Sequence, residues 1–265
     1  MSLTIVEDGL LERTLRARRT AGRKLLVPYV TGGLDGWREA IEAAAAAGAD
    51  AVEVGIPFSD PVMDGPVIQE ASQRALEAGT TPAAILEELA KLDAGIPVAV
   101  MTYYNPVFRA GHDRFAGDLR QAGVSAAIVP DLPLEEAGPW CEAADRAGIE
   151  TVLLAAPTTP DERLPRLCER SRGFVYSVGL LGVTGERSSL AATAVDLARR
   201  LKAVTDRPVL VGVGVSNAAQ AREASMVADG VIQGASVVRR LLDGGPEAVG
   251  AYVAEVRAAL DELER

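Results

Sequence analysis

Two acidic residues stand where a carboxyl group could transfer protons. Glu53 lies in the short apolar run 51–54, and a strand buried on both faces would remove its carboxyl group from water. An unpaired carboxyl group in such a place tends to keep its proton, which suits a general acid. A backbone or arginine partner would give Glu53 a structural role instead, and its position alone does not separate the two roles.

Asp64 lies in the loop just after this run, within Pro61–Pro66. Asp64-Gly65 is a common turn pair, so a turn role is the commoner explanation of this residue type and spacing. Asp60, directly before Pro61, has a similar turn interpretation. In a fold whose active site lies at the C-terminal ends of its strands, both Glu53 and Asp64 would nevertheless be candidates for chemistry.

Three glycine-containing segments favour a phosphate site. Glycine lets backbone N–H groups approach an anion closely, and a helix N-terminus attracts negative charge. The segments 212–216 (GVGVS) and 234–236 (GAS) follow the last two apolar runs of the chain, where parallel barrels usually bind phosphate. The segment 182–185 (GVTG) could add donors and close over the ligand as a lid.

Residues that form covalent or metal-bound intermediates are scarce. We expect Lys91 and Lys202 on outer helices and Lys24 before the first strand, so no lysine is placed to form a Schiff base. His112 is the single histidine, which argues against a Ser-His-Asp triad and a zinc site; we predict no metal site. Carboxylates and a phosphate site without either electrophile indicate a substrate that supplies its own electron sink.

The elements that must position these residues alternate regularly along the chain. Eight short apolar runs, bounded by Gly, Pro or Asp, have the character of buried parallel strands: 25–30, 51–54, 97–101, 126–129, 151–155, 173–178, 208–212 and 229–232. Amphipathic stretches between the runs predict helices, including 36–47, 82–92, 135–147 and 190–204. Thr81-Pro82 has the composition of a helix start.

This order predicts an α/β fold, a (β/α)8 TIM barrel in which residues 1–265 form a single domain. The amphipathic segment 8–20 predicts an extra N-terminal helix that plugs the barrel bottom, and 249–263 has the spacing of the last outer helix. A doubly wound open sheet is the alternative. It is disfavoured because 212–214 lacks the third glycine of the dinucleotide-binding motif and comes late in the chain.

Composition limits the possible partners. The chain has 27 basic and 37 acidic residues and a formal net charge of −10, which argues against a nucleic-acid partner. No apolar run reaches the roughly 18 residues of a membrane span, and the acidic N-terminal stretch lacks the order of a signal peptide. Cys141 and Cys168 make neither a disulfide framework nor a metal-ligand spacing. We therefore expect a cytoplasmic protein without membrane or nucleic-acid partners.

Several segments together resemble the tryptophan synthase alpha chain family. The run Val52–Pro61 (VEVGIPFSDP), followed by Asp64–Pro66, is highly specific to it, and the likeness runs in order from about residue 20 to the end. Further matching segments are LVPYVT at 26–31, YYNP at 103–106, PDLP at 130–133, GVTG at 182–185 and GVGVS at 212–216. The resemblance implies a lyase of L-tryptophan biosynthesis that cleaves indole-3-glycerol phosphate to indole and glyceraldehyde 3-phosphate.

This reaction would explain the missing electrophile, because protonation of indole C3 creates a cation that accepts the electrons of the breaking C–C bond. The resemblance implies that Glu53 is the acid–base residue and that Asp64 accepts the indole N–H bond and stabilises the positive ring. The residues implied to line the indole pocket are Tyr29, Ile68, Met101, Tyr103, Ile128 and Tyr176. Thr184 would belong to a closing loop, and the implied phosphate donors are Gly185, Gly214, Gly234 and Ala235.

The resemblance also implies a partner. Indole would pass through a tunnel into a tryptophan synthase beta chain within an α2β2 tetramer. Pyridoxal phosphate would belong to that beta chain, so no cofactor is expected in this chain. The candidates for the docking face are Asp60, Pro61, Asn105 and Pro133, for which ordinary turn chemistry is the alternative explanation.

Two segments depart from the family pattern. The family's phosphate loop usually reads Gly-Ser-Ala, whereas this chain has Gly234-Ala235-Ser236, so a hydroxyl group at 235 is absent. Ser236 is the candidate to replace part of it. The segment 31–36 reads TGGLDG where the family often has an Ala-Gly-Asp-Pro arrangement, and we expect this to alter local loop shape only.

Three other functions remain open on the sequence. A stand-alone indole-releasing lyase of a specialised pathway would need the same carboxyl groups and no beta chain. A catalytically dead regulatory relative is disfavoured because Glu53, Asp64 and Tyr176 are intact. A sugar-phosphate isomerase on the same barrel is disfavoured by the specific run 53–66.

Overall fold

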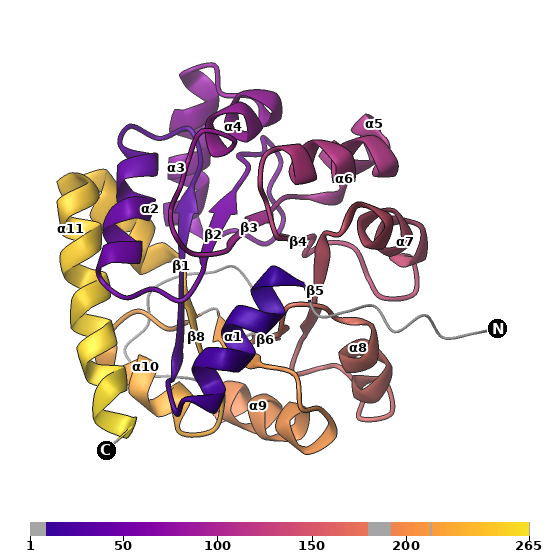
Figure 1. Ribbon diagram of the computed structural model, residues 1–265, viewed down its shortest axis with the longest axis vertical. Helices are drawn as coiled ribbons and strands as arrows, with labels where there is room; N and C mark the ends of the chain where they lie inside the picture. The colour runs from indigo at the N-terminus through magenta and orange to yellow at the C-terminus, as the bar shows by residue number, and fades with distance from the viewer. Residues whose placement is uncertain (1–8, 180–191, 213, 265) are drawn as a thin grey trace.

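The computed structural model describes residues 9–179, 192–212 and 214–264. Eight parallel strands pair in chain order, and the last pairs with the first, which closes a barrel (Figure 1). The strands are β1 (Leu25–Thr31), β2 (Val52–Gly55), β3 (Val98–Met101), β4 (Ala126–Ile128), β5 (Glu150–Ala155), β6 (Val175–Val178), β7 (Val209–Gly212) and β8 (Gly230–Gln233). The predicted (β/α)8 barrel is confirmed, and the open-sheet alternative is wrong.

Helices surround this barrel. They are α1 (Leu10–Thr20), α2 (Trp37–Ala46), α3 (Pro66–Glu77), α4 (Pro82–Leu89), α5 (Tyr104–Ala110), α6 (His112–Gln121), α7 (Gly138–Ala147), α8 (Leu164–Arg170), α9 (Ala192–Val204), α10 (Ala218–Ser225) and α11 (Ala235–Asp261), followed by the 3-10 turn η1 (Glu262–Glu264). Within α11 the backbone leaves the helical conformation at Gly245, with φ of 69°, directly before Pro246. The predicted last outer helix is the part of α11 beyond this break.

The start of α4 follows the sequence signal, whereas its end does not. Thr81 caps the helix by accepting a hydrogen bond from the N–H of Ala84 at 3.2 Å. The helix ends at Leu89 instead of residue 92, and the turn toward β3 that follows contains Gly95 with φ of 66°. Lys91 therefore lies beyond α4, not on it as predicted.

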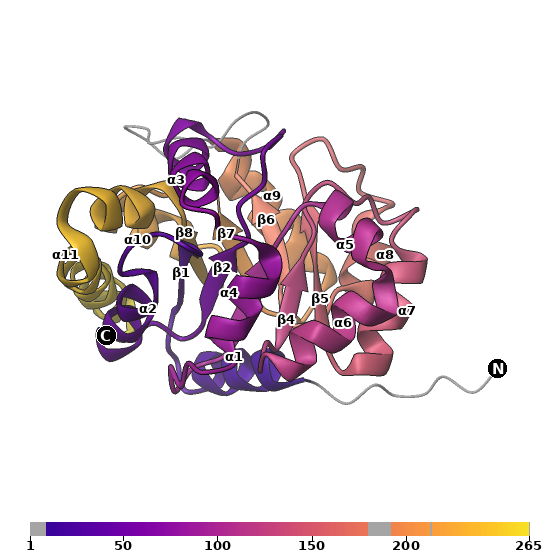
Figure 2. The ribbon, with the colours of Figure 1, turned by 90° about the horizontal axis from the view of Figure 1, so that it is seen from above.

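The helix α1 closes the N-terminal end of the barrel, as predicted for this segment (Figure 2). Leu11 and Leu15 are fully buried and pack against the barrel interior. Glu150, the first residue of β5, accepts hydrogen bonds from the N–H groups of Leu11 and Glu12 at 2.7 and 2.9 Å. These N–H groups belong to the first turn, where the helix itself supplies no acceptor, so a strand residue caps the plug.

Apolar side chains fill the barrel interior above this plug. The interior cluster combines the small residues Ala51, directly before β2, Ala99 of β3 and Ala126 of β4 with the large ring of Phe174, directly before β6. Alternation of large and small side chains lets the layers interlock, so the lower barrel is a packed core. Polar chemistry is therefore confined to the C-terminal ends of the strands.

Candidate active site

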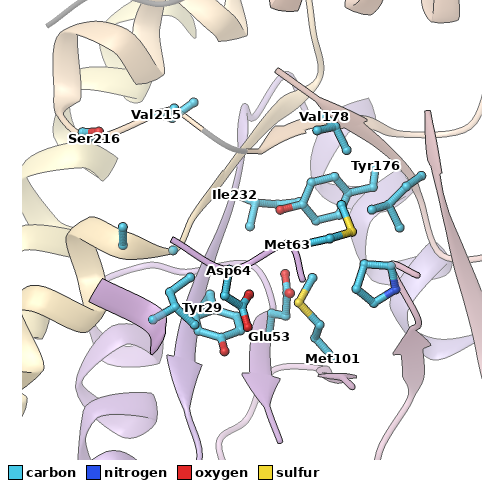
Figure 3. A pocket seen from close by; sticks show the side chains of 16 residues that line it. Tyr29, Glu53, Met63, Asp64, Met101, Tyr176, Val178, Val215, Ser216 and Ile232 are labelled. Atoms are coloured by element: carbon cyan, nitrogen blue, oxygen red, sulfur yellow. The ribbon is translucent and has the colours of Figure 1, made fainter. Parts of the chain in front are cut away.

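A cavity opens at the C-terminal ends of the strands (Figure 3). The predicted site residues that line it are Tyr29, Glu53, Asp64, Ile68, Met101, Tyr176, Gly214, Gly234 and Ala235. They come from β1, β2, β3 and β6, from the loops that follow β2 and β7, from α3, and from the junction between β8 and α11. The fold thus brings together residues that are as much as 206 positions apart, from Tyr29 to Ala235.

Glu53 is a buried carboxyl group without a partner. It is 1% exposed, and neither of its carboxyl oxygens accepts or donates a hydrogen bond among the described residues. Burial, and then the negative charge of Asp64, raise its pKa from 4.5 to about 8. No arginine or backbone group satisfies it within the described part of the chain, so the structural explanation that the sequence left open has no support here.

Asp64 reaches the same cavity from the loop after β2. Burial raises the pKa of its carboxyl group, and a hydrogen bond from the Tyr103 hydroxyl opposes that rise. The Tyr103 oxygen also accepts the N–H of Met63 at 3.1 Å, and its ring stacks on Phe58 with centroids 5.2 Å apart. Tyr103 therefore ties this loop to the end of β3 and orients Asp64.

The turn explanation of Asp64 fits the structure poorly. Its backbone carbonyl accepts a hydrogen bond from Gln69 Nε2 at 2.7 Å, while its side chain faces the cavity. The helix α3 begins at Pro66 with Gly65 as its cap residue, and no side chain caps that end. The loop is thus held by its backbone and by Tyr103, which leaves the carboxylate available to a ligand.

Two glycines make room for the tyrosine rings of the cavity. A Cβ atom at Gly55 would lie 1.8 Å from the hydroxyl oxygen of Tyr29, and one at Gly212 would lie 2.3 Å from that of Tyr176. Any side chain at either position would displace a ring. Tyr29 and Tyr176 are 6% and 5% exposed and both line the cavity, and aromatic rings suit contact with a planar aromatic ligand.

The glycine segments meet on the other side of the cavity. Gly214 has φ of 92°, and Gly234 directly precedes the first residue of α11. The first N–H groups of a helix have no acceptor within it, and the helix dipole favours an anion there. This arrangement can bind a phosphate group through backbone N–H groups. The lack of a hydroxyl group at Ala235 leaves these backbone donors in place.

Ser236 does not face the cavity. Its side chain is 1% exposed and lies beside Tyr252 of α11, away from the described lining residues. The expectation that Ser236 replaces the missing hydroxyl group is therefore wrong, because the next residue of a helix points about 100° away from its neighbour. Thr184 and Gly185 lie outside the described residues.

Two residues predicted to line the indole pocket do not line the cavity. Ile128, at the end of β4, is fully buried in the barrel interior. Tyr103 lies beside the cavity with its hydroxyl group engaged by the loop after β2. Neither is among the described lining residues, so both prove to be supporting positions.

Seven lining residues were not among the individually predicted site residues, although two of them belong to the predicted phosphate segment 212–216: Met63, Pro130, Leu154, Val178, Val215, Ser216 and Ile232. The alternation of side chains along a strand could have predicted two of them, because side chains two positions apart share a face. Val178 is two positions beyond the predicted Tyr176, and Ile232 two before the predicted Gly234. Met63 reaches the cavity only through the path of the loop after β2, which no local pattern encodes.

The proposed docking residues lie at the same end of the barrel, in the loops or helices that follow β2, β3 and β4. Asp60, Asn105 and Pro133 are exposed, and Pro61 is partly so. Two large apolar side chains on this rim are also exposed, Val62 at 72% and Phe108 at 65%. A contiguous apolar patch rimmed by polar residues marks a contact surface, whereas single exposed apolar side chains are ordinary on a protein surface.

Comparison with known proteins identifies the family. The model of the tryptophan synthase alpha chain family matches residues 15–264. The chain belongs to the tryptophan synthase alpha chain family. A tryptophan synthase alpha chain of Streptomyces coelicolor is 46% identical over 261 residues, 97% of this chain and 96% of that protein. One from Thermobifida fusca is 49% identical over 241 residues, 88% of this chain and 89% of that protein.

Solved structures agree. A chain of Mycobacterium tuberculosis tryptophan synthase has a TM-score of 0.88 and 40% identity, covering 96% of this chain and 99% of that chain. The tryptophan synthase alpha chain of Legionella pneumophila has a TM-score of 0.86 and 30% identity, covering 96% and 98%. The reaction of the alpha chain family is a lyase reaction in tryptophan biosynthesis.

Two further findings concern the described residues alone. Among residues 9–179, 192–212 and 214–264, no group of three or more His, Cys, Asp or Glu side chains could hold a metal ion. Within the same ranges, none of the helices has the length and apolar character needed to cross a membrane.

Proposed function

We propose that this chain cleaves indole-3-glycerol phosphate to indole and glyceraldehyde 3-phosphate, with Glu53 and Asp64 as its catalytic residues. The observation that carries the proposal is the unpartnered Glu53 carboxyl group, whose pKa is raised to about 8 inside a cavity that it shares with Asp64. The residues 1–265 would act as one barrel domain. Family membership supports the substrate class, and each part of that substrate would lie in one part of the cavity.

Glu53 would begin the reaction as an acid. A carboxyl group with a pKa near 8 is protonated at neutral pH and is still able to give up its proton. Transfer of this proton to indole C3 makes the ring an iminium cation. The C–C bond to the side chain then breaks, its electron pair returns to the ring, and the hydroxyl group on the departing carbon loses its proton to the Glu53 carboxylate. Indole and an aldehyde result, and Glu53 regains its proton.

Asp64 would stabilise the cation. Its carboxylate, oriented by Tyr103, would accept the indole N–H bond while positive charge develops on the ring. A fixed negative charge in a site sheltered from water stabilises such a cation more than water does. The same charge raises the pKa of Glu53 before the substrate binds, so one residue serves both steps.

The indole ring and the phosphate group of the substrate would each contact a different part of the cavity. The indole ring would lie between Tyr29 and Tyr176, against Met101. The phosphate group would bind the N–H groups of Gly214, Gly234 and Ala235, with Gly185 as a further donor and Thr184 in the loop that closes the site. The bond that breaks would then lie near Glu53.

The chain would work with a tryptophan synthase beta chain in an α2β2 tetramer. Asp60, Pro61, Asn105 and Pro133, together with the exposed Val62 and Phe108, would form the docking face. Because these residues lie beside the mouth of the barrel, after β2, β3 and β4, indole leaving the cavity would enter the beta chain directly. Pyridoxal phosphate would belong to the beta chain and take no part in the steps above.

An assay of indole release tests this proposal. The purified chain is expected to release indole slowly from indole-3-glycerol phosphate, and a tryptophan synthase beta chain is expected to accelerate the release. The Glu53→Gln chain, mixed with the same beta chain, controls for indole from contaminating enzymes. Fast release that the beta chain does not change would favour the stand-alone lyase, and no release in either mixture would contradict the reaction itself.

A further inference from the structure

Tyr252 connects the two halves of what we call the phosphate cradle, residues 214–216 after β7 and residues 234–236 at the start of α11. It lies on α11 beyond the break at Gly245 and is 4% exposed. Its hydroxyl group donates a hydrogen bond to the carbonyl oxygen of Ser216 at 3.0 Å. Ser216 lines the cavity and belongs to the loop after β7, two residues beyond Gly214, so this bond fixes one half of the cradle.

Ser216 is also held from its other side. Its N–H donates to the side-chain oxygen of Gln220 at 2.7 Å, and Gln220 is only 3% exposed. The N–H of Gln220 donates in turn to the Asn217 side chain at 3.0 Å, which caps the start of α10. The backbone N–H and carbonyl groups of Ser216 therefore both bond to buried side chains that do not line the cavity.

The other half of the cradle reaches Tyr252 through Arg240. The guanidinium group of Arg240 lies 4.1 Å above the centre of the Tyr252 ring, a cation–π contact. Its Nη1 also donates to the carbonyl oxygen of Ser236 at 3.1 Å, in the first turn of α11. Tyr252 thus contacts, directly or through one side chain, both backbone segments that would bind phosphate.

Two buried polar side chains beside Tyr252 add little to this connection. Ser236 and Gln233 lie near its hydroxyl group and partly oppose the rise that burial causes in its pKa. Neither makes a well-aligned hydrogen bond, since the Gln233 amide atoms and the Ser236 hydroxyl oxygen lack partners among the described residues. The bond from Tyr252 to Ser216 is therefore the polar link between Tyr252 and the loop, which the Gln220 side chain holds from the other side.

We propose that Tyr252 is a positioning residue that holds the loop after β7 against the first turn of α11, so that both segments meet one phosphate group. The proposal rests on the phosphate site proposed above. Because Tyr252 touches neither the indole pocket nor Glu53, its effect should be confined to ligands that carry phosphate. This selectivity separates it from a general effect on the barrel.

The experiment uses Tyr252→Phe, which removes the hydroxyl group and keeps the ring under Arg240. Affinity for glycerol 3-phosphate is expected to fall about three- to tenfold, the range for one neutral hydrogen bond. The KM for indole-3-glycerol phosphate should rise by a similar factor while kcat stays near that of the wild type. Binding of the indole-glycerol compound that lacks phosphate should not change.

Two further variants accompany this measurement: one should show the same loss of affinity, and the other is a control that should show none. Gln220→Met removes the acceptor on the other side of Ser216 and should reproduce the same phosphate-specific loss. Tyr104→Phe removes a hydroxyl group that lies 3.0 Å from His112 Nε2, away from the cavity, and should leave the affinity for glycerol 3-phosphate unchanged. If Tyr252→Phe fails to fold, Tyr252→Leu takes its place in the same measurements, because Gln220→Met tests only the other bond to Ser216.

The outcomes distinguish the two proposals. Wild-type affinity for glycerol 3-phosphate in folded Tyr252→Phe, or an equal loss for ligands with and without phosphate, would overturn the role of Tyr252. The phosphate site itself is tested by Ala235→Asp, whose carboxylate would repel phosphate from the start of α11. Unchanged affinity in Ala235→Asp, or no binding by the wild type, would show that phosphate does not bind there.

Discussion

Indole release by the Glu53→Gln variant is expected to fall by about 10²–10⁴-fold relative to the wild type, the usual range for loss of a general acid–base group. Glutamine keeps the size of the side chain but has no proton of suitable acidity to transfer to indole C3. Substrate binding should be largely kept, since the phosphate and the ring contact other residues. Steady-state kinetics with indole-3-glycerol phosphate, together with the affinity for glycerol 3-phosphate, measure both effects.

A matched control is available at the opposite end of the barrel. Glu150 is also buried, at 5% exposure, but its carboxylate caps α1 and lies far from the cavity. The Glu150→Gln variant should therefore lose stability and keep its turnover number. Near wild-type turnover in Glu53→Gln would mean that Glu53 is a structural residue and that another group moves the proton.

The second large effect is expected for Asp64→Asn. Asparagine keeps an oxygen that can accept the indole N–H bond but loses the charge that opposes the cation, so turnover should fall by about 10²–10³-fold. The same substitution should shift the pKa of Glu53 downward, because the charge of Asp64 contributes to its rise. Kinetics across pH 5–9 would record both changes in one experiment.

Thermal unfolding of Asp64→Asn separates catalysis from a turn role. Tyr103 and Gln69 hold the loop after β2 through bonds that do not require the Asp64 charge, namely to the Met63 N–H and the Asp64 carbonyl oxygen. The melting temperature should therefore change little. A variant that melted early but kept its turnover would support the turn explanation of Asp64-Gly65.

The strand pattern was readable from the sequence because buried parallel strands are short apolar runs with clear boundaries. Each of the eight runs overlaps a strand, and the strand ends place Glu53, Tyr176 and Gly234 at one edge of the barrel. The helix end at Leu89 was missed because apolar periodicity continues to Leu92, past the last helical residue. Periodicity marks which face is buried and is a weak guide to where a helix stops.

The side chains that contact each site residue could not be predicted from local sequence patterns. Whether Glu53 has a counter-charge depends on side chains from other strands, and the fit of Tyr176 depends on a missing Cβ at Gly212 of the next strand. The bond from Tyr252 to Ser216 joins residues 36 positions apart on different elements. Such relations follow from barrel closure and register, which no segment of the sequence encodes by itself.

The protonation of Glu53 has a consequence for stability. Its pKa in the folded chain lies above the ordinary value of 4.5, so the unfolded chain ionises first as the pH rises. The stability that Glu53 contributes is fully present below about pH 4.5 and is lost as the pH rises toward about 8. Relative to wild type, Glu53→Gln should therefore become more stable across this window.

A titration of the Glu53 carboxyl group tests most directly whether a buried acid holds its proton at neutral pH. Carbon-13 NMR of the folded chain labelled at glutamate side-chain carboxyl carbons follows it, and the signal that disappears in Glu53→Gln identifies the residue. The structure predicts a midpoint near pH 8, moved downward in Asp64→Asn. A midpoint near 4.5, with Glu53 ionised throughout the neutral range, would contradict its role as the proton donor.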